Sequence, residues 1–285
     1  MQRMIGVIGG SGVYQIAGVE GASWVRVKSP WGKPSDDVLV GRLNGTPIAF
    51  LPRHGRGHVE SPSSINYRAN IDALKRLGCT DVLAVSAVGS LRIDYAPGDF
   101  VLVDQYIDRT FAREKSFFGP GCVAHVSLAH PTCAHLSDAV AQAVPAGKRL
   151  HRAATYLAME GPQFSTLAES RLYRSWGADV IGMTGMPEAK LAREAEMCYA
   201  ALAMVTDYDC WHEGHGAVDV AQVIATLTAN AGHARAVVAA LPAHLPPEPC
   251  PQGCRHALTH ALMTAPAQRD PDLAAKLDAV AGRVL

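Results

Sequence analysis

Two aspartates separated by one residue, Asp207 and Asp209, are the clearest candidates for chemistry in this sequence. They follow Ala200–Val205, a run of small apolar residues that predicts a buried strand. The edge of an adenine ring offers an acceptor at N7 and a donor at its 6-amino group, so a protonated carboxyl beside an ionised one complements both. Two neighbouring carboxylates also resist joint ionisation, which raises the pKa of one of them. The alternative is that the pair only caps a loop or begins a helix, a common use of Asp.

Short apolar runs that predict strands alternate along the chain with segments of helical periodicity. The helical segments include Asn66–Leu77 and Pro187–Ala195. This alternation predicts an α/β fold with helices on both faces of a sheet, in which ligands bind at the carboxyl ends of strands. The residues directly after each run are therefore candidates for a site. The predicted strands are Ile5–Ile8, Pro47–Leu51, Val82–Val85, Asp99–Val103, Val180–Met183 and Ala200–Val205.

Composition favours a small molecule as the ligand. The chain has 285 residues, of which 48% are hydrophobic, enough for a full core. Lys plus Arg equals Asp plus Glu at 26 each, so no strong field attracts nucleic acid or an acidic membrane surface. The sequence has neither a membrane-spanning apolar stretch nor a signal-peptide pattern. We therefore expect a cytoplasmic protein without nucleic-acid or membrane partners.

Four predicted strands lead into turns that carry hydroxyls, backbone N–H groups or cationic side chains. Arginine matches phosphate with two parallel hydrogen bonds, and histidine adds a donor. Each turn alone has a structural explanation as a tight turn, a solvated basic loop or a helix cap. Four of them at strand ends favour phosphate as a shared ligand. The four turns are Gly9–Gly12, Pro52–His58, Ser86–Ser90 and Thr184–Glu188.

Two further features fit the rest of a nucleoside-like ligand. Phe164 lies in a predicted loop, where its ring either stacks on a flat heterocycle or plugs the loop from below. One face of a predicted helix carries Val220, Val223, Ile224 and Leu227, and the start of this helix has a capping pattern at Asp219–Gln222. Such a stripe is most often core, but its nearness to the aspartates allows it to line an apolar end of the ligand.

Other functional classes are less consistent with the motifs. A dinucleotide-binding fingerprint needs glycine at position 15, where this chain has Gln15, which argues against a nicotinamide-dependent oxidoreductase. A non-catalytic purine-binding module would need the aspartates and Phe164 but not Arg53 and His54.

Together these motifs resemble the purine nucleoside phosphorylases, and within them the methylthioadenosine phosphorylases. The matches run in order from residue 5 to about residue 230, and the remaining C-terminal part matches less distinctly. The resemblance implies a single domain over residues 1–285, with a mixed central β-sheet flanked by helices. The matching stretches are Ile8–Gly12, Arg53–Arg56, Asn66–Asn70, Gly89–Arg92, Asp99–Thr110, Glu160–Ser165, Trp176–Val180, Met183–Glu188 and Thr206–Trp211.

The resemblance also implies roles for individual residues. Asp207 donates to N7 of the purine, Asp209 accepts from its 6-amino group, Phe164 stacks on the base and Met183 contacts the ribose. His125 from a neighbouring subunit of a homotrimer closes the pocket for the 5′-methylthio group. That pocket falls on Val220, Val223 and Ile224. The phosphate site falls on Ser11, Arg53, His54, Ser86, Ala87 and Thr184.

The implied reaction is phosphorolysis of S-methyl-5′-thioadenosine to adenine and 5-methylthioribose 1-phosphate. Inorganic phosphate is the co-substrate, and no metal or organic cofactor is needed. The alternative is a broader specificity that includes adenosine, inosine or methylthioinosine. A 6-oxo purine would place an acceptor against Asp209, so we expect adenine-type substrates to be preferred. Adenine release without phosphate would indicate a hydrolytic nucleosidase instead.

The sequence departs from the family pattern at a few positions. Gly182 stands where some members have Asn beside the ribose-contacting Met, and Gln163 stands where some have Arg. Cys250 and Cys254 lie near a short cysteine motif of some relatives but are separated by three residues, which leaves open a disulfide, a weak metal site or neither. They end a proline-rich stretch, His244–Cys254, that predicts a loop between two C-terminal helices.

Overall fold

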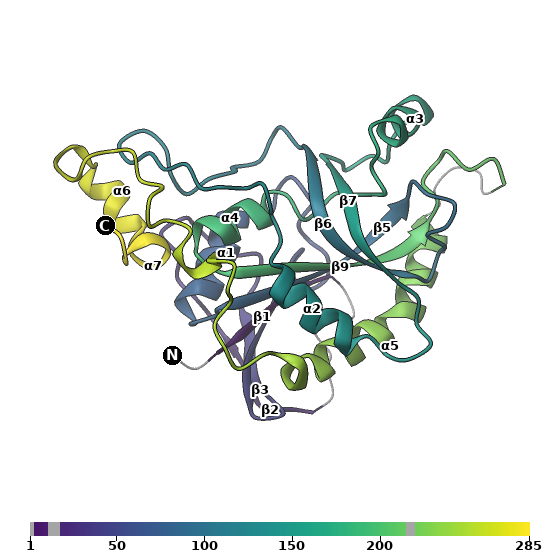
Figure 1. Cartoon of the computed structure of the whole chain (residues 1–285), viewed down its shortest axis with the longest axis horizontal. Coiled ribbons are helices and arrows are strands. Elements are labelled where there is room, and N and C mark those ends of the chain that lie inside the picture. The colour runs from purple at the N-terminus through teal and green to yellow at the C-terminus, as the bar shows by residue number, and fades with distance from the viewer. Residues whose placement is uncertain (1–2, 11–17, 215–219) are drawn as a thin grey trace.

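The computed structural model describes residues 3–10, 18–214 and 220–285, the last range without the side chains of positions 220 and 222. Within these residues the centre is a nine-stranded sheet in the order β2-β3-β4-β1-β5-β8-β7-β6-β9 (Figure 1). An additional pairing joins β9 to β5, so the last five strands of this order close into a ring. The strands are β1 (Ile5–Gly9), β2 (Val19–Val25), β3 (Val38–Leu43), β4 (Thr46–Pro52), β5 (Asp81–Ser90), β6 (Phe100–Arg109), β7 (Leu150–Met159), β8 (Val180–Gly182) and β9 (Cys198–Asp207).

The strands that matter most for a site run parallel to one another. Strand β1 pairs in parallel with β4 and β5, and β5 pairs in parallel with β9. Antiparallel pairs such as β5–β8 and β6–β9 make the sheet mixed. Because parallel strands end at the same edge, the residues that follow β1, β4, β5 and β9 come together there. The predicted α/β fold with a mixed central sheet is confirmed.

Alternation along β9 shows why the sheet needs helices on both faces. From Tyr199 to Val205 every second residue packs into one hydrophobic cluster, and from Cys198 to Met204 the intervening residues pack into the other. Successive side chains of a strand point to opposite faces, so a strand that is apolar throughout is stable only between two covering layers.

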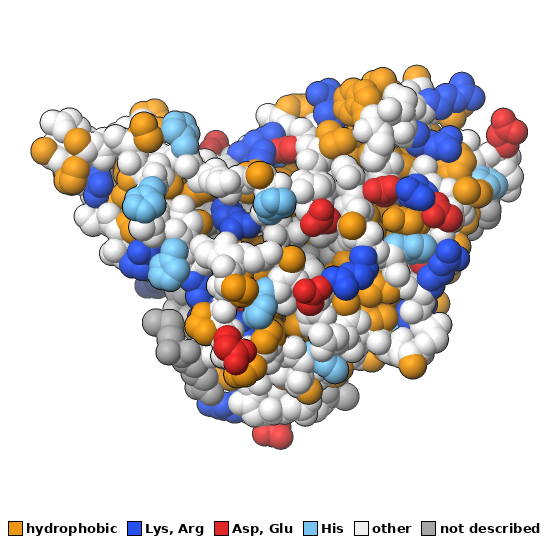
Figure 2. Space-filling view, viewed as in Figure 1, with side chains coloured by type: hydrophobic (Ala, Val, Ile, Leu, Met, Phe, Trp, Pro, Cys, Tyr) orange, Lys and Arg blue, Asp and Glu red, His pale blue; other side chains and the backbone are white. Residues whose placement is uncertain are grey.

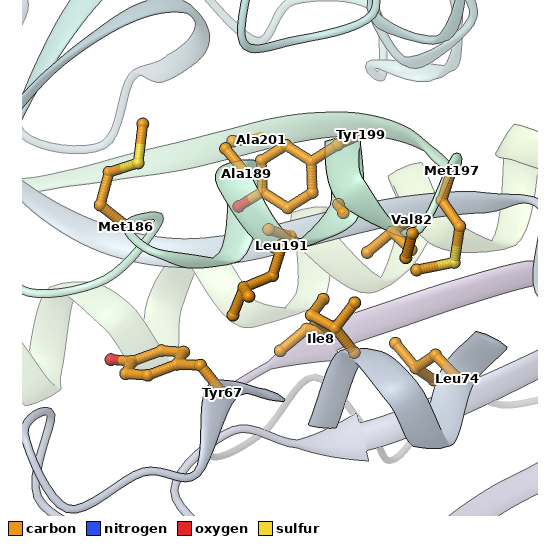
Figure 3. Packing of buried hydrophobic residues seen from close by; sticks show 14 of the residues in the cluster. Ile8, Tyr67, Leu74, Val82, Met186, Ala189, Leu191, Met197, Tyr199 and Ala201 are labelled. Atoms are coloured by element: carbon orange, nitrogen blue, oxygen red, sulfur yellow. The ribbon is translucent and has the colours of Figure 1, made fainter. Parts of the chain in front are cut away.

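The helices supply those two layers. Helices α1 (Tyr67–Arg76), α4 (Glu188–Glu194) and α7 (Asp278–Ala281) contribute to the first cluster, part of which is shown in Figure 3. Helices α2 (Ala134–Ala143) and α5 (Val220–His244) contribute to the second. The remaining helices are α3 (Leu167–Ser175) and α6 (Pro271–Lys276). No helix in the described part of the chain combines the length and apolar character needed to cross a membrane.

All six predicted strands are present, the predicted helices Asn66–Leu77 and Pro187–Ala195 are α1 and α4, and the proline-rich stretch after His244 is a loop between α5 and α6, as expected. The elements that the sequence did not predict are strands β2, β3 and β7 and helices α2 and α3. Strand β2 is exposed along most of its length and therefore lacks an apolar pattern. Helix α5 begins at Val220 as expected, although its proposed cap, Asp219, lies outside the described residues.

Candidate functional site

A cavity of about 590 Å³ lies at the carboxyl ends of β5 and β9, beside the loop after β4 and the first turns of α5. This volume is within the range of small-molecule sites. Strand direction explains its place, because β1, β4, β5 and β9 all end at this edge. The predicted site residues that line it are Arg53, His54, Ser86, Ala87, Phe164, Met183, Thr184, Asp207, Asp209, Val223 and Ile224.

Three predicted residues are not part of the observed lining. Ser11 lies outside the described residues, and so does the side chain of Val220. His125 is exposed and does not line the cavity of its own chain; its backbone N–H donates to the Ala261 carbonyl at 2.8 Å.

The two aspartates form a turn in which one orients the other. The backbone N–H of Asp209 donates to Asp207 Oδ1 at 2.8 Å, and the Thr206 hydroxyl donates to Asp207 Oδ2 at 2.7 Å. Asp209 has φ of 50°, a left-handed conformation that Asp tolerates better than most residues. The loop-capping interpretation is therefore correct as a description of the turn. It does not exclude a chemical role, since both residues also line the cavity.

The carboxyl groups of Asp207 and Asp209 differ in their surroundings and hydrogen-bond partners. Burial raises the pKa of Asp207, and the charge of Asp209 acts in the same direction. Asp209 is buried, with the Ser165 hydroxyl 2.8 and 2.7 Å from its two oxygens. The Ser165 hydroxyl can thus donate to the Asp209 carboxylate oxygens, and the raised pKa makes Asp207 the candidate to carry a proton. Ser165 belongs to a stretch that the sequence singled out, but its contact joins residues 44 positions apart and has no local pattern.

The guanidinium of Arg53 makes most of its hydrogen bonds within the protein. Its side chain is buried; Nε donates to Glu188 Oε1 at 2.6 Å and Nη2 donates to Glu188 Oε2 at 3.1 Å. Nη1 donates to the Val85 carbonyl at 2.8 Å, and Nη2 also reaches the Ile8 carbonyl at 3.4 Å. A guanidinium has five N–H groups, so these contacts leave little of it for a ligand. The prediction of a simple bidentate phosphate clamp needs this correction: Arg53 supplies fixed positive charge at the cavity wall.

His54 also differs from the expectation that it adds a hydrogen-bond donor. Its Nδ1 lies 2.9 Å from the Glu60 carbonyl, which can only accept, so Nδ1 carries the hydrogen. Burial, and next the charge of Arg53, lower the pKa of His54 to about 4. At neutral pH the imidazole is uncharged and its Nε2 is an acceptor. His58 belongs to the same basic loop but is not among the residues that the resemblance assigns to phosphate. It stacks on His54 with ring centroids 4.2 Å apart and also lines the cavity.

A buried ion pair fixes the start of the loop that carries Phe164. Arg113 Nε donates to Glu160 Oε1 at 3.2 Å, and Nη1 donates to the Met186 carbonyl at 2.7 Å. Although burial alone raises the pKa of Glu160, hydrogen bonds from the Ser63 hydroxyl and two backbone N–H groups lower it to about 2. Glu160 is therefore a structural anion. Phe164 itself is 44% exposed at the cavity lining, available to a ligand's flat face rather than packed as a core plug.

Gly182 is explained by Tyr156. A Cβ at position 182 would overlap the Tyr156 hydroxyl and lie 2.8 Å from its Cζ. That hydroxyl accepts a hydrogen bond from the Thr184 backbone N–H at 3.3 Å, and Tyr156 is buried. Tyr156 thus occupies the space that a side chain at position 182 would need, and it supports Thr184 in the cavity wall.

The start of α5 forms the apolar wall of the cavity. Val223 and Ile224 line it, as expected, together with Leu227 and Thr228 one turn later. The Thr228 hydroxyl donates to the Ile224 carbonyl at 2.8 Å, so towards the cavity it can only accept. This end therefore has one polar acceptor that the sequence did not indicate.

Comparison with known proteins places this arrangement in a family. Residues 4–243 match the model of the phosphorylase superfamily. This chain belongs to the phosphorylase superfamily. It is 69% identical to the S-methyl-5′-thioadenosine phosphorylase of Cereibacter sphaeroides over 100% of this chain and 99% of the relative.

Solved structures of this family share the fold. A methylthioadenosine phosphorylase from an antarctic soil metagenomic library superposes with a TM-score of 0.91 at 46% identity, covering 98% of this chain and 99% of the other. A mutant adenosine/methylthioadenosine phosphorylase from Schistosoma mansoni, in complex with adenine, has a TM-score of 0.85 at 34% identity, with 92% and 99% covered.

We expect Glu188→Gln to destabilise the fold, because it leaves Arg53 as a buried charge without its counter-ion. Breaking a buried ion pair costs about 3–5 kcal/mol, which urea denaturation at neutral pH would measure. Asp37→Asn is the matched control: it breaks an ion pair with Arg26, whose side chain is 83% exposed, and should cost less than about 1 kcal/mol. Equal losses in the two variants would contradict the importance given to the Arg53–Glu188 pair.

Proposed function

We propose that this chain catalyses the phosphorolysis of S-methyl-5′-thioadenosine to adenine and 5-methylthioribose 1-phosphate, a reaction of purine and methionine salvage. One observation carries the proposal: a single cavity joins an aspartate pair, a cationic and hydroxyl-bearing wall, and an apolar helix face. These three parts match a purine, a phosphate and a methylthio group. The relative that is 69% identical bears the name of this activity.

At the base end, Asp207 donates a proton or hydrogen bond to N7 as the glycosidic bond breaks, because its raised pKa favours the protonated form. Asp209, which the Ser165 hydroxyl orients, accepts from the 6-amino group. Phe164 stacks on the ring and Met183 contacts the ribose. An adenine leaves more readily when its N7 is protonated, so this arrangement acts on the leaving group.

At the phosphate end, the anion waits on the face of the sugar opposite the base. The sugar gains oxocarbenium character as the base departs, and the phosphate stabilises and then captures it. Ser11, Ser86, Ala87 and Thr184 are the proposed donors, and Arg53 supplies charge. His54 Nε2, as an acceptor, takes the P–O–H hydrogen of monohydrogen phosphate and so turns the unprotonated oxygens towards the donors and the sugar.

We expect adenine release from S-methyl-5′-thioadenosine to depend strictly on added phosphate. Asp207→Asn should lower kcat by roughly 10²–10⁴, the usual size of a general-acid contribution, with the fold intact by circular dichroism. Adenine can be quantified by chromatography, with and without phosphate. Release that continues in phosphate-free buffer would indicate a hydrolase and contradict the proposal.

The role given to His54 predicts discrimination between phosphate and sulfate. Sulfate at neutral pH has no hydroxyl to donate, so it should bind roughly tenfold or more weakly than phosphate. His54→Ala should reduce this preference, whereas His130→Ala, an exposed position outside the cavity, should leave it unchanged. Binding of both anions can be measured by calorimetry. Equal loss of phosphate and sulfate affinity in His54→Ala would show that His54 is a donor after all.

The substrate preference follows from the two ends of the cavity. Asp209 favours adenine-type bases over 6-oxo purines, whose O6 would face another acceptor. Val223 and Ile224 favour a methylthio group over a 5′-hydroxyl, and Val220 is proposed to join them. The acceptor on Thr228 offers a 5′-hydroxyl one partner, so the discrimination against adenosine should be weaker than the discrimination at the base.

We also propose that the chain is one domain and assembles as a homotrimer in the cytoplasm, with no metal or organic cofactor in the reaction. Support for one domain comes from the first hydrophobic cluster, which joins residues from Ile8 to Ala281.

Support for assembly comes from exposed hydrophobic residues that a partner subunit could cover, among them Phe111, Leu172 and Trp176. Figure 2 shows such side chains interspersed with charges of both signs on one face. The exposed His125 would then reach a neighbouring cavity.

Complementation tests whether His125 of one subunit completes the active site of its neighbour. His125→Ala chains keep Asp207, and Asp207→Asn chains keep His125, so a mixed trimer would contain some complete sites. We expect co-expressed chains to be more active than either variant alone, with the assembly mass measured by light scattering. Activity equal to the mean of the two variants would argue against a contribution of His125 to a neighbouring site.

A further inference from the structure

Four cysteines outside the proposed active site come together in the folded chain. Cys133, Cys198, Cys250 and Cys254 place their sulfur atoms within 4.8 Å of one another. Cys133 Sγ is 3.4 Å from Cys250 Sγ, which is 3.6 Å from Cys254 Sγ. Three of these residues are buried and Cys250 is partly buried.

The cluster is built from four separate parts of the fold. Cys133 is the N-cap residue of α2, Cys198 is the first residue of β9, Cys250 lies in the loop after α5, and Cys254 begins a 3-10 turn, Cys254–His256. Asp207 lies at the opposite end of β9. A ten-residue strand rises by about 3.3 Å per residue, so the cluster is roughly 30 Å from the aspartate pair.

We propose that these cysteines bind one Zn²⁺ ion as a tetrahedral four-thiolate structural site. Zinc binds thiolates at about 2.3 Å, which places neighbouring sulfurs of a tetrahedron about 3.8 Å apart. The sulfur separations of 3.4 and 3.6 Å and the upper limit of 4.8 Å require only small adjustments to reach that geometry. Four thiolates and no oxygen ligand favour zinc over magnesium or calcium.

Groups that carry positive charge or partial positive charge adjoin the cluster. Arg193 Nη1 lies 3.5 Å from Cys254 Sγ, and the backbone N–H of Gln252 donates to Cys250 Sγ at 3.4 Å. The N-terminus of α2 adds positive potential at Cys133. Four thiols release four protons on binding, leaving a net charge of −2 with the zinc, which these groups offset in part.

A solvent-accessible cavity lies beside the cluster. A second cavity, of about 300 Å³, is lined by Thr132, Arg193, Gln252 and Gly253, which adjoin the cluster in sequence or contact it. None of the four cysteines lines this cavity, but it brings solvent to residues that flank them. Once bound, a zinc ion would tie the loop after α5 to the start of β9 and the start of α2.

The direct test is the metal content of the full-length protein purified in reducing, chelator-free buffer. We expect about one zinc per chain by elemental mass spectrometry, and about one cobalt with tetrahedral thiolate absorption bands after exchange. Cys250→Ser and Cys254→Ser should lose the metal, lower the melting temperature by several degrees, and keep kcat/KM for S-methyl-5′-thioadenosine within about twofold.

Cys122→Ser is the matched control, since Cys122 is buried but outside the cluster, and it should retain its zinc. Wild-type protein that holds neither zinc nor cobalt under reducing conditions would overturn the proposal. Disulfides among these four cysteines in the intact protein, found by mass spectrometry of peptides, would also overturn it. Neither result bears on the proposed phosphorolysis.

Discussion

The buried ion pair between Arg53 and Glu188 is the interaction on which the site depends. Through it, the end of β4 is tied to α4, and further hydrogen bonds from Arg53 reach the Ile8 carbonyl on β1 and the Val85 carbonyl on β5. Tyr199 on β9 donates to the same Glu188 carboxylate at 3.1 Å. One pair of charges therefore joins the parallel strands whose carboxyl ends form the cavity. Burying both charges is costly, and their geometry has to be well defined to offset that cost.

Structural and chemical roles coincide in several residues. Asp207 accepts from the Asp209 backbone and thereby shapes the turn that presents both carboxyl groups. Tyr156 fills the space above Gly182 and supports Thr184. Glu160 is strongly anionic yet is used to fix the loop before Phe164 rather than to meet a ligand. A perturbed pKa in this protein therefore marks a functional group only where the group also faces the cavity.

The sequence predicted those parts of the site that follow apolar strands. Asp207, Arg53 and Thr184 could be found because each lies at the end of a strand or within two residues of it. Parallel pairing of β4, β1, β5 and β9 then brings Arg53 and Asp207 to one edge, whereas Thr184 follows β8, which is antiparallel to β5. Glu188 could not be assigned its role, since its partner Arg53 lies 135 positions away. The tautomer of His54 depends on the Glu60 carbonyl, a backbone contact with no sequence pattern.

The cysteine cluster is another feature that could not be predicted from local sequence patterns. Only Cys250 and Cys254 are close in sequence, whereas Cys133 and Cys198 reach them through the packing of α2 and β9. Strand β2 was missed for a different reason, because an exposed strand has no apolar periodicity to detect. Local patterns therefore predicted the elements with a buried face and the residues at their ends, and long-range contacts decided the rest.

We propose that Asp209 recognises the 6-amino group while Asp207 assists the leaving base. The most direct measurement is the ratio of kcat/KM for methylthioadenosine to that for methylthioinosine, in the wild type and in Asp209→Asn. The wild type should prefer methylthioadenosine by about 10⁴ or more. In Asp209→Asn the side-chain amide can donate to O6, so the ratio should fall by roughly 10² or more. A ratio that stays unchanged while both activities fall together would contradict the claim and leave Asp209 as a residue that only shapes the turn.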